Sequence, residues 1–187
     1  LRSGNGVSFN NNYLENTTRG VRVFGADHKV YRNYIKNGSI AIDLPTSDFT
    51  RGEKMSKVGY FRAEDIDISD NYILTPSSMA IRMGNGTRKH APENIRLNNN
   101  RILIDKDDAL DIEIMESTSR SRLTFNENST YGGVESRSDQ AISSQRVTRR
   151  TRDEFNDVDI EKFLGFLPYQ SNDPKVGASW RRPTINK

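Results

Sequence analysis

Apolar and polar residues alternate in short runs along most of this chain. Examples are Val21-Arg22-Val23, Ile66-Asp67-Ile68, Ile95-Arg96-Leu97 and Ile112-Glu113-Ile114. Alternation with a period of two is typical of β-strands that bury one face. No long segment before about residue 150 has the apolar stripe of an amphipathic helix. The pattern therefore predicts an all-β protein built from short strands.

A repeated unit connects these runs. It reads apolar-x-apolar, then two or three residues, then Asn, and a further residue followed by Leu or Ile. The Asn residues of the repeats are Asn12, Asn33, Asn71 and Asn100, so the spacings are 21, 38 and 29 residues. Repeats of a little over twenty residues, lengthened by insertions, are typical of coils that stack and cover each other's apolar faces. An Asn at each bend tolerates the left-handed conformation and can hydrogen-bond to the Asn of the next coil.

These features predict a right-handed parallel β-helix over residues 1–135. An antiparallel sandwich is the alternative, but it does not explain the recurring Asn bend. Residues 136–187 are rich in Ser, Arg, Gln and Asp at first and then in Pro, and we expect a last coil or irregular cap of the same domain. Within this part, residues 157–166 are expected to form a short helix capped by Asp157 or Asp159.

Composition narrows the classes of function. The 28 Lys and Arg against 25 Asp and Glu give a net charge of +3, which permits a polyanionic partner without requiring one. No zinc-finger, basic-zipper or aromatic RNA-binding signature supports nucleic acid as that partner. The absence of cysteine excludes disulfides and thiolate chemistry. No apolar stretch is long enough for a membrane span.

Several segments resemble polysaccharide lyase family six, which contains alginate lyases and chondroitinase B. Residues 1–5 read LRSGN, residues 7–14 read VSFNNNYL, and residues 20–34 read GVRVFGADHKVYRNY, where the family has LRHGN, a strand, an Asn bend and GIRxxGxxHxVxxNY. Residues 91–95 (APENI) and 176–180 (VGASW) resemble later elements of that family. The resemblance implies a lyase for an acidic, uronate-containing polysaccharide, with alginate as the first candidate substrate. It also implies a secreted or periplasmic bacterial protein.

Two departures from the family pattern bear on completeness. Ser3 stands where the family has His. The family's catalytic Lys and acidic calcium ligands lie on coils that would precede Leu1. We therefore expect calcium, if it is used, to bind outside this chain, and we expect the N-terminal half of the same enzyme, or a complementary chain, as a partner. Neither nucleic acid nor membrane is expected as a partner.

A uronate lyase removes the proton beside the sugar carboxylate and expels the linked oxygen. Neutralising that carboxylate makes the proton more acidic, and in the family calcium serves this purpose. By resemblance, Arg2 is the catalytic Arg that stabilises the leaving oxygen. Arg22, which alternation places on the outer face of its strand, would bind the carboxylate. Arg82 repeats that strand pattern and would extend the row of substrate-binding residues.

His28 has two readings, a contact to a sugar or a cap of its turn. His90 is interpreted as structural. Tyr13, Tyr34 and Tyr72 occupy equivalent repeat positions, which favours a packed aromatic ladder over sugar stacking. The acidic run at 105–113 and the Arg cluster at 146–152 are interpreted as solvated.

Other functions stay open at this point. A sulfated glycosaminoglycan would suit the same lyase chemistry. A non-catalytic carbohydrate-binding β-helix is favoured by Ser3 and by the missing base. A glycoside hydrolase would need paired carboxylates, for which Asp65, Asp67 and Asp70 are the candidates.

Overall fold

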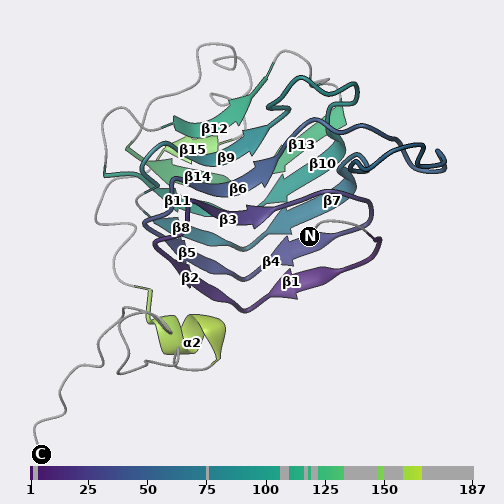
Figure 1. Ribbon diagram of the computed structural model, residues 1–187. Helices are drawn as coiled ribbons and strands as arrows, with labels where there is room; N and C mark the ends of the chain where they lie inside the picture. Colours follow the sequence, from purple (N-terminus) through teal and green to yellow (C-terminus); the bar gives the residue numbers. More distant parts are fainter. Residues whose placement is uncertain are drawn as a thin grey trace, which may run out of the picture.

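Short parallel strands make up nearly all of the regular structure. The computed structural model describes residues 1, 4–74, 76–105, 110–115, 118, 122–132, 147–149 and 158–165. Three sheets run through it (Figure 1). Sheet A contains β1 (Ser8–Asn10), β4 (Lys29–Tyr31), β7 (Glu64–Ser69), β10 (Glu93–Asn98) and β13 (Leu123–Asn126). Sheet B contains β2 (Tyr13–Glu15), β5 (Tyr34–Lys36), β8 (Tyr72–Leu74), β11 (Arg101–Leu103), β14 (Asn128–Tyr131) and β15 (Val147–Arg149). Sheet C contains β3 (Arg19–Arg22), β6 (Ile40–Leu44), β9 (Met79–Met83) and β12 (Leu110–Ile114).

From β1 to β14 the chain visits sheets A, B and C in turn and then returns to sheet A, whereas β15, the next described strand, again lies in sheet B. Three consecutive strands, one from each sheet, form what we call a layer. Every strand pairing among the described residues is parallel and joins neighbouring layers. The prediction of an all-β protein with parallel sheets is therefore confirmed, and an antiparallel sandwich is excluded for these strands.

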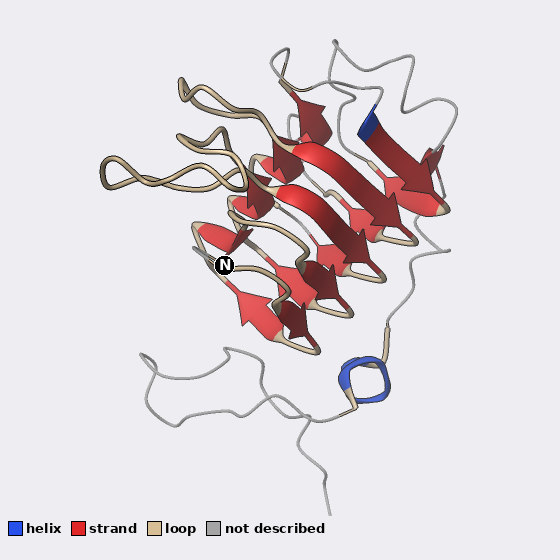
Figure 2. Ribbon diagram, turned by 90° about the vertical axis from the view of Figure 1, so that its right-hand side faces the viewer, coloured by secondary structure: helices blue, strands red, loops and turns tan. Residues whose placement is uncertain are grey.

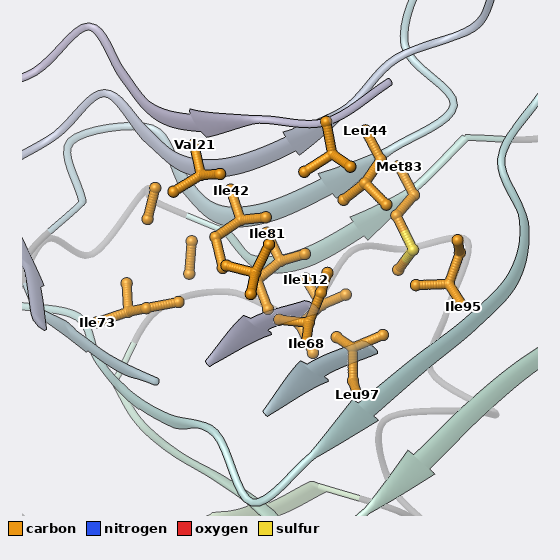
Figure 3. Packing of buried hydrophobic residues seen from close by; sticks show 14 of the residues in the cluster. Val21, Ile42, Leu44, Ile68, Ile73, Ile81, Met83, Ile95, Leu97 and Ile112 are labelled. Atoms are coloured by element: carbon orange, nitrogen blue, oxygen red, sulfur yellow. The ribbon is translucent and has the colours of Figure 1, made fainter. Parts of the chain in front are cut away.

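The core is a set of apolar columns that run across the layers. In sheet C, Val21 pairs with Ile42, Ile42 with Ile81, and Ile81 with Ile112, so one buried side chain lies on the next (Figure 3). Sheet A repeats this arrangement with Ile66–Ile95 and Ile68–Leu97. Alternation along each strand thus becomes a continuous core, because the register between layers matches like with like. Each fully buried aliphatic side chain contributes about 1.5–3 kcal/mol.

An asparagine ladder fills the corner between sheets A and B. The side-chain amide of Asn33 donates to Asn71 Oδ1 at 3.0 Å, and that of Asn71 donates to Asn100 Oδ1 at 2.9 Å. Asn12 begins the ladder and Asn128 extends it. The predicted Asn-to-Asn bonds are thus present. The left-handed conformation, however, belongs to the residue before each Asn: Asn11, Arg32, Asp70, Asn99 and Glu127 all have φ between 50° and 55°.

Tyrosines stack on the outer face of sheet B, as the repeat positions predicted. The Tyr13 and Tyr34 rings lie 5.3 Å apart, and the Tyr34 and Tyr72 rings lie 5.5 Å apart, both nearly parallel. Helix α2 (Ile160–Leu164) packs its Phe163 ring against Tyr72. Asp159 caps this helix, as one of the two expected caps. No helix in the described part of the chain could cross a membrane, given its length and polarity.

Of the three kinds of connection between strands, the A-to-B and the C-to-A connections differ most in length. Between sheets A and B the connection is very short and always contains the ladder Asn or ends at it. Between sheets C and A the connections differ widely in length, and segments 45–63 and 84–92 project as long loops on one side of the stack (Figure 2). We call these loop 45–63 and loop 84–92. They are joined to each other where Ser47 and His90 exchange backbone hydrogen bonds.

Candidate functional site

A row of charged side chains lies along the outer face of sheet C. Arg22 on β3 pairs in register with Asp43 on β6, and Asp43 pairs with Arg82 on β9. Val21 and Ile42, beside them in the strands, point into the core. Period-two alternation therefore places Arg22 and Arg82 outward, as predicted, and the register between layers brings them to opposite sides of one carboxylate.

Asp43 is the centre of this row. Its side chain is 0% exposed, and it forms ion pairs with Arg82 Nε at 3.0 Å, Arg22 Nε at 3.3 Å and Arg19 Nε at 3.4 Å. We call these four residues the Asp43 cluster. Three guanidinium groups face one carboxylate, so the cluster keeps an excess of positive charge. A buried carboxylate needs such partners, because burying it alone is very unfavourable.

The cluster has hydrogen-bonding capacity that the protein does not use. Arg22 Nε and Asp43 Oδ2 lie 3.3 Å apart without hydrogen-bond geometry, and the buried Arg82 Nη2 has no hydrogen-bond partner among the described residues. Arg19 and Arg22 are also partly exposed, at 42% and 38% of their side chains. The exposed parts of Arg19 and Arg22 can present N–H donors to an anionic group on the face of the sheet.

An aromatic stack connects the cluster to the loops. The Arg22 guanidinium lies over the Phe24 ring at 5.2 Å, and Phe24 stacks on Tyr60 of loop 45–63 with ring centroids 4.1 Å apart. Arg88 of loop 84–92 covers Tyr60 at 5.1 Å and also pairs with Asp48 at 3.1 Å. The two loops are thus fixed beside Arg22 by cation–π contacts and one ion pair.

His28 lies inside the protein. This residue is only 1% exposed. The backbone N–H of Val7 donates to Nδ1 at 3.1 Å, and Nε2 donates to the carbonyl of Phe24 at 2.9 Å. Burial lowers the pKa of His28 below its ordinary value, so the neutral ring is favoured. Of its two sequence-based readings, this geometry favours the turn-holding one, since neither ring nitrogen is left for a sugar.

Arg2 and Ser3 lie outside the described residues. The neighbouring Leu1 lies beside the end of β3: its N–H donates to the carbonyl of Arg22, and its carbonyl accepts from the backbone N–H of Phe24. The predicted alignment of Arg2 with Arg22 stays a prediction.

Other candidates from the sequence have structural partners. His90 lies 3.7 Å from Glu53 and bonds through its backbone to Ser47. Asp67 pairs with Arg96 at 3.1 Å. Residues 106–109 of the acidic run and Arg146, Arg150 and Arg152 of the basic run lie outside the described residues, as do residues 176–180.

Sequence reasoning missed Asp43, Arg19 and the Tyr60–Arg88 contact. A charged residue inside the apolar run Ile42-Asp43-Leu44 was a usable signal for Asp43. No local signal could identify its arginine partners, because they come from other layers. Within the part of the chain that the structure describes, no group of three or more His, Asp or Glu side chains could hold a metal ion.

Comparison with known proteins adds one finding about the fold. No protein-family model and no curated protein matches the sequence. Among solved structures, the chain resembles a mannuronic acid-specific polysaccharide family 6 lyase from human gut microbiota, with a TM-score of 0.59 and 21% sequence identity. The match covers 82% of this chain and 36% of that lyase, so this chain spans little more than a third of the lyase's length. The chain therefore shares its fold of stacked parallel strands with part of this lyase.

Proposed function

We propose that this chain is part of a polysaccharide lyase that cleaves a uronate-containing acidic polysaccharide by β-elimination, with alginate as the first candidate. Its layers would wind as a right-handed parallel β-helix. The A-to-B-to-C order of the strands, the segments at 1–5 and 20–34, and the likeness to a mannuronic acid-specific lyase support this proposal.

The Asp43 cluster is the observation that carries the proposal. Arg22 and Arg82 lie on one outer face, oriented by a carboxylate between them, with an excess of positive charge. A uronate carboxylate on this face would accept hydrogen bonds from the guanidinium groups. Neutralising the negative charge of that carboxylate lowers the free energy of the carbanion that forms when the neighbouring proton is removed.

Further elements of the proposal come from the family resemblance. Arg2 would stabilise the leaving oxygen electrostatically, since an arginine stays protonated at ordinary pH. The general base, and calcium with its ligands, would come from coils preceding Leu1, supplied by the same enzyme or by a complementary chain. Secretion or export to the periplasm belongs to the same proposal.

The test is ultraviolet absorbance of the unsaturated uronate product, followed with the complete gene product on alginate. Arg22→Gln and Arg82→Gln should each lower kcat/KM by about tenfold or more, because a charge-assisted hydrogen bond contributes about 1.5–3 kcal/mol. Arg96→Gln is the matched control: it pairs with Asp67 on a neighbouring strand and is 43% exposed, but it lies on sheet A. Equal losses in all three variants would contradict a special role for the sheet C face.

A second candidate is a non-catalytic carbohydrate-binding protein, which Ser3 favours because the family has His at that position. Retained alginate binding without any gain in absorbance would support this candidate over the lyase. A gain on chondroitin or dermatan sulfate, with none on alginate, would instead assign a glycosaminoglycan substrate.

A further inference from the structure

A cavity lies at the corner between sheets A and B, beneath helix α2. Its volume is about 770 Å³. The corner contributes Arg32, Asp70 and Arg101, and the α2 segment contributes Asp159, Lys162 and Phe163. Ligand cavities of several hundred Å³ suit a small molecule or one to two sugar units. None of the residues that line this cavity belongs to the Asp43 cluster, which lies on sheet C.

The cavity is held together by contacts between the two segments. Arg32 donates from one guanidinium nitrogen to the carbonyl of Phe163 at 3.0 Å. The Phe163 ring packs against Tyr72 with centroids 6.2 Å apart. Val158, Ile160 and Leu164 belong to the same apolar cluster. The α2 segment is therefore fixed over the corner by both polar and apolar contacts.

Positive charge exceeds negative charge by one in the lining of this cavity, because Arg32, Arg101 and Lys162 stand against Asp70 and Asp159. Within the described ranges, neither Arg101 nor Lys162 has a carboxylate within ion-pair distance, and both are exposed. The two carboxylates present have other hydrogen bonds: Asp70 accepts from the Asn99 side chain at 2.7 Å, and Asp159 accepts from the backbone of Lys162 at 3.1 Å.

The lining has the composition that an acidic sugar requires. Arg101 and Lys162, which form no ion pair among the described residues, suit a carboxylate. The Asp and Asn side chains suit ring hydroxyls, and the partly exposed Phe163 ring offers an apolar surface to a sugar face. A neutral sugar would leave both cations without a partner, and an apolar ligand would leave every polar group unsatisfied.

We infer that this cavity is a second binding site for a uronate saccharide, separate from the sheet C face. It would hold one stretch of the polysaccharide while another stretch of the same polysaccharide molecule lies on sheet C. The two sites would then act together on long substrates. The choice of a uronate as the ligand rests on the proposed function, whereas the separate location of the site rests on the cavity alone.

The experiment is calorimetric titration of the complete gene product with a uronate disaccharide obtained by acid hydrolysis of the polymer. A neutral disaccharide is titrated in parallel. The double variant Arg101→Gln/Lys162→Gln should weaken one class of uronate binding by about tenfold or more, since tenfold corresponds to one lost charge-assisted contact. Arg96→Gln should leave binding unchanged. Both altered side chains are exposed, so the variants should fold, which circular dichroism checks.

The outcomes separate this inference from the proposed lyase activity. Loss of binding in the double variant supports the inference even if no unsaturated product forms on alginate, because binding is read without catalysis. Cleavage of long alginate should fall in the double variant while cleavage of short oligosaccharides is retained. Unchanged uronate binding in the double variant, or equal affinity for the neutral disaccharide, would overturn the inference whatever the lyase assay shows.

Discussion

Replacing Asn71 by Ala should reveal how much the asparagine ladder stabilises the stack of layers. Asn71 is 1% exposed and lies in the middle of the ladder. Its amide nitrogen donates to Val30 O and Asn100 Oδ1, both at 2.9 Å. Its Oδ1 accepts from the backbone and the side chain of Asn33, at 3.1 and 3.0 Å. The substitution removes all four bonds from a place that water does not reach.

The expected loss follows from those bonds. Each contributes about 1 kcal/mol net, so the free energy of unfolding should fall by about 4 kcal/mol. The backbone N–H of Asn33 is left without the acceptor that it has in the ladder, which keeps the estimate at the upper end of single substitutions. Asn71→Asp should cost at least as much, because it removes both N–H donors and places a buried carboxylate against the acceptor oxygens of Val30 and Asn100.

Urea denaturation followed by far-ultraviolet circular dichroism measures this loss. Asn12→Ala is the control: Asn12 makes two side-chain bonds at the partly exposed end of the ladder, so its loss should be about 1 kcal/mol. If Asn71→Ala costs no more than Asn12→Ala, the ladder does not stabilise the stack and the reasoning fails.

Three further outcomes are expected. Burial lowers the pKa of His28 from 6.5, so below that pH the unfolded chain takes up a proton that the folded chain does not. The free energy of unfolding should therefore be highest above about pH 6.5 and fall as the pH drops below it. Denaturant titrations across this range should show a weaker pH dependence in His28→Gln. Gly20→Ala should cost about 1–3 kcal/mol in urea denaturation, because its Cβ would lie 2.5 Å from the carbonyl oxygen of Ala41; a stable variant would show that this contact is relieved without cost. Asp43→Asn should cost about 3 kcal/mol, chiefly by leaving Arg82, whose side chain is only 12% exposed, without its counter-charge. A double-mutant cycle with Arg82→Gln checks this, since additive losses would mean that the two side chains are not coupled.

The stacked arrangement could be predicted from local patterns. Alternation such as Ile66-Asp67-Ile68 fixes which side chains enter the core, and the recurring Asn marks the same bend in each repeat. Asn128 was missed because Ser129 and Thr130 follow it, and Thr130 stands where the other repeats have Leu or Ile. The left-handed residue before each Asn was also missed, because residues as different as Arg32 and Glu127 occupy that position.

The site could be predicted only in part, because it depends on which layers come into register. Alternation placed Arg22 and Arg82 on an outer face. The meeting of both with Asp43 depends on insertions of different lengths between layers, which sequence spacing does not resolve. For His28, the sequence showed a polar residue at a turn; the partner that decides its role, Val7, comes from the preceding layer.

The contrast between the A-to-B and the C-to-A connections indicates where this architecture can accept insertions. The corner with the Asn ladder cannot take an insertion without breaking buried amide contacts on both sides. The C-to-A connections end in strands whose register is already set by the ladder and the core columns. The length of these connections can therefore change at little cost in stability, because doubling a flexible loop costs only about 0.6 kcal/mol in closure entropy. New recognition elements could therefore be grafted in place of loop 84–92, beside the charged face, while the packing beneath stays as it is.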